Sequence, residues 1–203
     1  MSKNLLLIAI LLLTACTSEP KPTTLQHVTI ESKDTKEMKA LKIALSEYTQ
    51  ATIDDDVTTL ISFIYPKAFK IVSKEKMETM LNKTFRSGTA PKVKAVKHKT
   101  VEPIKKYTQG LYSIITSSIS SVVKSPRPDD LKFEKYMLKI LKEKLASRGT
   151  VTVNQEKHIF NVEHINKTLA VNENGSWKFI GFKQAEKYIS KDIFPIDLID
   201  KLN

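Results

Sequence analysis

Apolar residues recur every three or four positions through much of the first half of the chain, which is the period of an amphipathic α-helix. The first such segment covers residues 33–52. Consecutive aspartates at 54–56 then interrupt the pattern and supply an N-cap and negative charge for a second helix, which Pro66 ends. A third helix begins at Ser73 and is closed by Gly88. Its predicted buried face consists of four apolar side chains, Met77, Met80, Leu81 and Phe85.

The character of the chain changes to β after Pro91. Alternation over residues 92–95 and a run rich in Ile, Ser, Thr and Val over 107–123 predict two strands. A charged helix over 129–147 follows, with an aspartate cap at its start and Gly149 as its stop. This helix is expected to lie as an insertion between strands.

The last part of the chain predicts an antiparallel meander. Its three runs lie at about 150–165, 167–172 and 176–182. Asn174 and Gly175 supply the positive-φ pair of a tight hairpin between the last two runs. Helices first and an antiparallel sheet last predict the α+β fold class.

The N-terminus has the pattern of an export signal. Lys3 is followed by the nine apolar residues Leu5 to Leu13, too few to span a bilayer as a helix. The next residues, Leu13-Thr14-Ala15-Cys16, resemble the lipobox of bacterial lipoproteins, in which small residues fit the peptidase cleft and the thiol takes the lipid. The resemblance implies a signal peptide over 1–15 and a mature chain anchored to a membrane by palmitate-type acyl chains on Cys16.

The segment after the cysteine has the composition of a linker. Residues 16–25 hold two prolines and few apolar groups, so we expect an extended tether from the lipid anchor to a single α+β domain over 26–203. Thr17, rather than Asp, follows the cysteine, which in enteric-type sorting favours export to the outer membrane. The expected location is the bacterial cell envelope, on the outer membrane and facing the periplasm.

Composition and charge limit the kinds of site and partner that the sequence predicts. Cys16 is the sole cysteine, which excludes internal disulfides and cysteine-based zinc sites. The formal net charge is +11, but nearly all the basic residues are lysine, whereas planar phosphate recognition favours arginine. No recognition helix or interleaved aromatic motif accompanies the charge, so we expect no nucleic acid partner. The densest basic cluster comprises Lys92, Lys94, Lys97, Lys99, Lys105 and Lys106. It is either the solvated face of a strand or a contact for anionic lipid or an acidic protein.

Two regions resemble a known superfamily. Residues 53–57 (IDDDV) with 64–66 (IYP), and the later run 174–179 (NGSWKF), are similar to the N-terminal helices and the last hairpin of nuclear transport factor 2-like domains. The resemblance implies a curved antiparallel sheet wrapped around helices to form a cone with a pocket. The superfamily includes isomerases, cyclases and many non-catalytic binding modules, so the fold does not decide function. A cystatin-like helix-on-sheet fold is the alternative.

Candidate chemistry is sparse. By strand alternation His158 and His164 share a face with Phe160, while Glu163 takes the other face. No third ligand accompanies the histidines and no phosphate-binding glycine loop is present, so we expect no metal and no cofactor. Side chains expected to line the cone are Tyr48, Tyr112, His164 and Trp177.

These patterns favour a non-enzymatic envelope lipoprotein whose domain binds a small apolar ligand or a protein partner through the cone or sheet face. One alternative is a cone enzyme of the isomerase or cyclase type with His164 or Glu163 as its base. Another is an immunity or assembly factor whose basic face binds an acidic protein. The oligomeric state, the ligand and the partner are left open.

Substituting Cys16→Ser tests the lipid anchor. We expect the full chain, expressed in a Gram-negative host fed a labelled fatty acid, to carry the label, and the variant to carry none, because the thiol is the acceptor. The label on the protein, measured in a denaturing gel, shows whether Cys16 is acylated. Label that persists in the variant contradicts the assignment.

Overall fold

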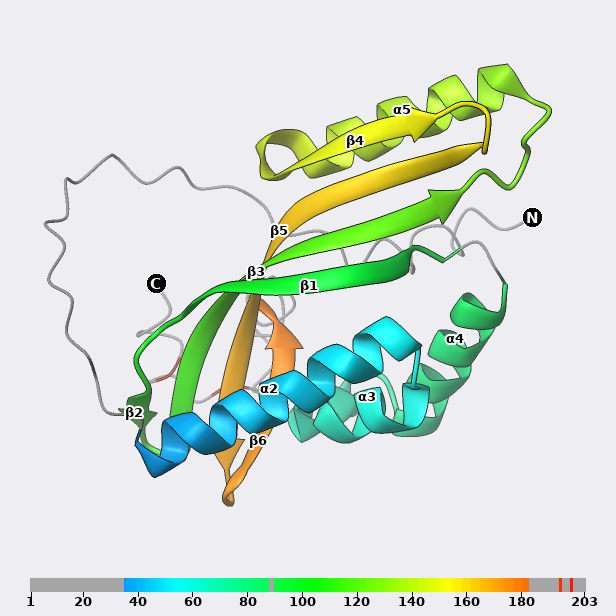
Figure 1. Cartoon of the computed structure of the whole chain (residues 1–203). Helices are drawn as coiled ribbons and strands as arrows, with labels where there is room; N and C mark the ends of the chain where they lie inside the picture. The colour runs from blue at the N-terminus through cyan, green and yellow to red at the C-terminus, as the bar shows by residue number, and fades with distance from the viewer. Residues whose placement is uncertain (1–34, 88–89, 183–193, 195–197, 199–203) are drawn as a thin grey trace, which may run out of the picture.

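The computed structural model describes residues 35–87, 90–182, 194 and 198. The chain has an α+β fold, as the sequence predicts (Figure 1). Among the described residues, three α-helices precede the first strand: α2 (Lys36–Asp54), α3 (Val57–Phe63) and α4 (Lys74–Arg86). A short 3-10 helix, η1 (Pro66–Lys70), connects α3 to α4.

Six strands form one antiparallel, strongly curled half-barrel sheet (Figure 1). They are β1 (Lys92–Val101), β2 (Lys105–Tyr107), β3 (Gly110–Lys124), β4 (Gly149–Asn154), β5 (Ile159–Glu173) and β6 (Ser176–Gly181). The main order is β1-β3-β5-β4, with β2 also paired to β3 and β6 also paired to β5. Helix α5 (Leu131–Leu145) and the 3-10 helix η2 (Ala146–Arg148) lie between β3 and β4, where the insertion is predicted.

The predicted helix caps are confirmed. The side chains of Asp56, Ser73 and Asp130 accept hydrogen bonds from the backbone N–H three residues later, at 3.1, 3.3 and 3.0 Å. Each cap satisfies a donor that the first turn of a helix leaves open. The local signals that begin these helices therefore lie in the sequence itself.

Three predictions are wrong in detail. The strands predicted over 150–165 and 167–172 are divided elsewhere, because the break falls at 155–158, where His158 has a φ of 51°. The Asn154 side chain closes this turn by accepting from Lys157 N at 3.0 Å, without a glycine or proline to mark it. Pro66 does not end α3, which stops at Phe63; it begins η1, because its fixed φ suits a first helical position.

The third error concerns α4. Its apolar stripe is amphipathic, as predicted, but none of its residues is buried. Met77, Met80, Leu81 and Phe85 are all only half-buried. Periodicity identifies the face that could be buried, whereas the neighbouring elements decide how far it is covered.

Two helices pack on the same face of the sheet, at opposite ends. We call this the helix-covered face; β3 contributes to it Ile115, Ser117, Ile119, Ser121 and Val123, by their register with β5. At one end α2 packs Leu41 and Leu45 against Ile115, Ala170, Trp177 and Phe179. At the other end α5 packs Met137, Leu141 and Leu145 against Val123, Phe160 and Val162. The middle of the face lies between the two hydrophobic clusters.

The opposite face is buried only at the end where β2 and β6 lie. There Tyr112, Leu169 and Val171 pack with Tyr65, Ala68 and other apolar residues. Further along, this face carries exposed side chains such as Asn161 and Glu163. Burial of both faces at one end explains why β5 is buried at four consecutive positions, Thr168 to Val171, of which the last three are apolar.

A carboxylate ties three turns together at that end. Glu173 Oε1 accepts from Tyr107 at 2.6 Å, from Tyr65 at 2.8 Å and from the Lys67 ammonium at 3.1 Å. Lys67 also donates to Gln109 at 2.6 Å. Although burial alone raises the pKa of Glu173, these hydrogen bonds and the Lys67 charge outweigh it and hold the pKa below the ordinary 4.5. Burial and the neighbouring Glu173 raise the pKa of Tyr65, so its hydroxyl stays protonated as a donor.

Glu173→Gln tests this network. We expect a loss of about 1–3 kcal/mol in the free energy of unfolding at pH 7, because two hydroxyls and an ammonium lose a charged acceptor. Since the folded-state pKa lies below 4.5, the stabilisation is full above about pH 4.5 and declines as the pH falls through the folded-state pKa. Urea unfolding at several pH values measures both effects. The exposed Glu163→Gln on the same strand is the control; equal losses in the two variants contradict the prediction.

Candidate functional site

The middle of the helix-covered face is polar and buried. Ser117 and Ser121 of β3 and His164 of β5 are exposed by 5%, 4% and 2%. In the β3–β5 register Ile119 pairs with His164 and Ser121 pairs with Val162, so Ser121 and His164 are diagonal neighbours on one face. Buried polar side chains at this position need partners, and several of them have none.

His164 lies in this region without hydrogen bonds. Neither Nδ1 nor Nε2 has a partner among the described residues, although both atoms are inaccessible. Burial, together with the positive charge of Arg148, lowers the pKa of His164 from 6.5 to about 4. The imidazole is therefore neutral at pH 7, with one nitrogen a donor and the other an acceptor.

Arg148 approaches from the end of η2. Its Nη2 donates to the Lys144 carbonyl at 2.9 Å, while Nε and Nη1 are buried with no partner in the part of the chain that the structure describes. Arg148 lies near His164 because the next residue, Gly149, pairs directly with His164. A Cβ on Gly149 would lie 2.3 Å from the Glu163 carbonyl oxygen and 2.8 Å from His164 Cβ. Glycine therefore permits β4 to begin against His164, immediately after Arg148.

His98 and Ser117, which lie nearer α2, are satisfied. His98 of β1 forms hydrogen bonds with Thr49 of α2 at 3.0 Å and with Ser117 at 2.9 Å. Partial burial lowers the pKa of His98, which keeps the ring neutral and able to accept one bond and donate the other. This bridge fixes α2 over β1 and β3. Ser121 Oγ, His164 and two nitrogens of Arg148 lie beyond this bridge and have no partner among the described residues.

The predicted cone-lining residues lie on both faces. Tyr48 stacks on Phe179 at 4.8 Å, and the buried Trp177 lies in the same cluster beneath α2, with its Nε1 unpaired among the described residues. Tyr112 is on the opposite face, 6.2 Å from Tyr107. His164 thus shares a face with Tyr48 and Trp177 but not with Tyr112. Their role as ligand contacts stays a prediction.

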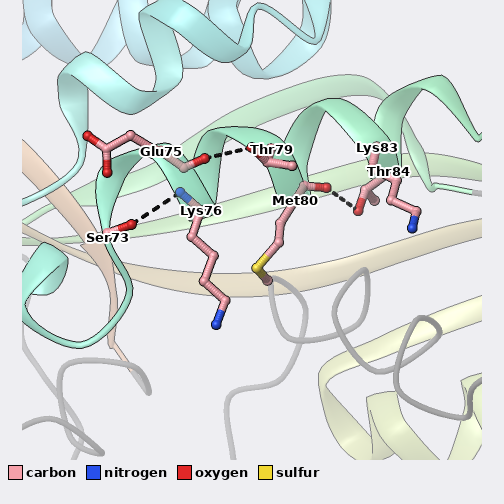
Figure 2. A pocket seen from close by; sticks show the side chains of 7 residues that line it. All are labelled: Ser73, Glu75, Lys76, Thr79, Met80, Lys83 and Thr84. Atoms are coloured by element: carbon pink, nitrogen blue, oxygen red, sulfur yellow. Dashed lines mark hydrogen bonds between the residues drawn. The ribbon is translucent and has the colours of Figure 1, made fainter.

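The hollows in the surface lie elsewhere. One, of about 590 Å³, is bordered by α4 and is shown in Figure 2. Its wall offers the side chains of Lys76, Met80 and Lys83, whereas the hydroxyls of Thr79 and Thr84 donate to carbonyls of their own helix. A second, of about 290 Å³, lies where β1 begins. No residue named as lining either hollow has a buried polar atom without a partner.

The predicted basic cluster follows the edge of the sheet. Lys92 pairs with Asp55 at 2.6 Å and Lys105 with Glu102 at 3.4 Å. Lys94 and Lys99 lie at register shifts of β1, and Lys97 pairs opposite Ser118 on the face that the helices leave uncovered. Lys106 is exposed on β2. Exposed lysines and bulges protect an edge strand from pairing with other chains, which accounts for this pattern.

The other candidate groups stand apart. Glu163 is exposed on the opposite face from His164, where Ser120 donates to it at 3.4 Å. His158 contacts the buried Glu134 of α5 at 3.0 Å.

No group of three or more His, Cys, Asp or Glu side chains within the described ranges is placed to hold a metal ion. None of the helices described is both long and apolar enough to cross a membrane. Cys16 lies outside the described residues.

The sequence identified His164 but missed Arg148 and Ser121. Strand alternation was a sufficient signal for Ser121, which lies two positions from Val123 on the same face. Arg148 gave no periodic signal because it lies in a connection. A scan of the chain against protein-family models gives no match, and a search of curated proteins finds no relative.

His164→Leu tests whether the histidine is left unsatisfied. We expect stability at pH 7 to be unchanged or to rise by about 1–2 kcal/mol, because a buried group without partners is replaced by an apolar one. The folded-state pKa of about 4 lies below the unfolded value of 6.5, so the wild type loses stability as the pH falls between these values, on the order of 3 kcal/mol for this group.

The variant should lack this part of the acid sensitivity. Urea unfolding at pH 7, 6, 5 and 4 measures it, and the contribution of His98 cancels because both proteins retain it. Glu163→Gln is again the control. A variant that is much less stable at pH 7, with an unchanged pH dependence, contradicts the assignment.

Proposed function

We propose that the protein is a non-enzymatic lipoprotein of the bacterial cell envelope. Acyl chains on Cys16 anchor it to the outer membrane, and its α+β domain binds a small ligand in the periplasm through the helix-covered face. The lipobox-like segment 13–16 and the tether over 16–25 support the anchor. The helices and curled sheet are the architecture expected of a nuclear transport factor 2-like cone, and membership of that superfamily is part of the proposal.

One observation carries the binding role: buried polar groups without partners gather on the helix-covered face. Ser121, His164 and Arg148 leave five atoms unsatisfied among the described residues. Each such group costs about 1–3 kcal/mol, so a structure that retains several of them stands to gain from a ligand that satisfies them. Apolar clusters flank the polar groups on both sides, which suits a ligand with an apolar body.

The enzymatic alternative has weaker support. An isomerase or cyclase needs a base and hydrogen-bond donors in one site. Glu163, one of the two candidate bases, is exposed on the face opposite His164 and so lies outside any buried site. The low pKa of His164 also makes it a weak base at neutral pH. The alternative of a basic face for an acidic protein rests on the exposed lysines of β1 and β2, for which protection of the edge is a sufficient reason.

Native mass spectrometry tests the ligand. The full-length protein is produced in its source host, extracted in a neutral detergent and measured before and after denaturation. We expect an added small-molecule mass that denaturation removes. Ser121→Val, which places a methyl group where the hydroxyl is unpaired, should lower the occupied fraction at least severalfold. Ser120→Val, on the other face of the same strand, is the matched control.

Two outcomes overturn the proposal. A bare chain in both states leaves the helix-covered face without a ligand. A complex with another protein, with no small molecule, moves the function to protein interaction.

A further inference from the structure

We propose that Arg148, His164 and Ser121 form a binding site for the oxyanion head group of a ligand, a carboxylate or a phosphate. The inference rests on the proposed function, because it names the chemical class of the ligand at the same site. It depends on the charge of Arg148 and on the hydrogen-bond donors of the three side chains.

Among the described residues, no carboxylate balances the charge of Arg148. Its Nε and Nη1 are inaccessible, and no carboxylate within the described ranges forms an ion pair with it. The buried carboxylate of α5, Glu134, is engaged by His158 at 3.0 Å, and Glu163 is exposed on the other face. A buried guanidinium without an anion is costly, and an anion that enters the site removes this cost.

The donor set fits an oxygen-rich anion. The guanidinium has two unpartnered nitrogens, Nε and Nη1, the Ser121 hydroxyl can donate, and a neutral His164 has one N–H. Each of the three side chains can donate a hydrogen bond to an oxyanion, and the positive charge of Arg148 disfavours a cationic head group. Hydrogen bonds from a charged donor to an oxyanion are about twice as strong as neutral ones.

The side chains come from three elements that the fold holds together. Ser121 and His164 are fixed by the β3–β5 pairing, and Arg148 by the bond of its Nη2 to Lys144 and by the tight approach of Gly149 to His164. The apolar cluster of α5 begins next to them at Val162, which gives the body of a ligand a surface adjacent to its head group. The site therefore pairs an anionic head with an apolar extension.

The chain offers a direct probe of Arg148. Its sequence contains three arginines, and Arg86 and Arg127 are exposed. The ¹H–¹⁵N correlation of the arginine Nε–H groups of the full-length protein in neutral detergent therefore has three signals, two of which are internal controls. Sodium phosphate and sodium butyrate are the anionic probes. Butanol is the neutral control, and sodium chloride matches the ionic strength.

We expect phosphate or butyrate, but neither butanol nor chloride, to shift the Arg148 signal saturably and to raise the thermal unfolding midpoint. A response to phosphate indicates a phosphate head group, and a response to butyrate indicates a carboxylate head group. Arg148→Gln should weaken this midpoint-derived affinity about tenfold or more, since it loses the charge. The affinity of Arg148→Lys should lie between those of the wild type and Arg148→Gln. The exposed Arg127→Gln should have the affinity of the wild type. If Arg148→Gln does not fold, Ser121→Ala should fold and bind severalfold more weakly.

Three results overturn the inference: no anion moves the Arg148 signal beyond the chloride control, butanol acts as well as butyrate, or Arg148→Gln keeps wild-type affinity. A ligand found by native mass spectrometry that lacks an oxyanion overturns the inference while the proposed function stands. A wild-type protein isolated without any small molecule contradicts the proposed function, and the Arg148 titration still decides whether the site binds anions.

Discussion

The pairing of β3 with β5 is the constraint on which the rest of the structure depends. These two 15-residue strands pair along nearly their whole length, from Leu111 with Asn172 to Lys124 with Ile159. The register fixes every side chain of both strands on one face or the other, because a slip of one residue would reverse them all. Both hydrophobic clusters beneath α2 and α5, and the polar region between them, follow from this single register.

Buried polar groups have hydrogen-bond partners at one end of the paired strands but not in the middle. At the Glu173 end both faces are covered, and the polar groups there satisfy one another through the bonds of Tyr65, Tyr107 and Lys67. In the middle of the helix-covered face the groups are buried but open. A fold under selection for stability alone would be expected to fill such positions with apolar residues, because a partly satisfied polar network is worse than an apolar core. The contrast is the physical basis for placing function at His164 and Arg148.

The helix N-termini and the last hairpin were predictable because their signals are local. Asp56, Ser73 and Asp130 each cap the helix that begins at the next residue, by accepting from the N–H three residues downstream. Asn174 and Gly175 turn the chain with positive φ. The turn at 155–158 was not predictable in the same way, since Asn154 closes it with a single side-chain bond and His158 adopts a left-handed φ without a glycine. The prediction that α4 is buried is wrong for another reason. The helix has an apolar stripe, but the fold covers that stripe only in part.

The sequence by itself determined the α+β class, the helix starts, the side of β5 on which His164 lies, and the lipobox-like segment around Cys16, because each depends on residues close together in the chain. Only the tertiary structure decided that Tyr112 and Tyr48 lie on opposite faces, that Ser121 lies diagonal to His164, and that the charge of Arg148 acts on His164. Those relations join residues far apart in sequence. They are set by strand register and by where α5 returns the chain to the sheet, and no local pattern encodes either.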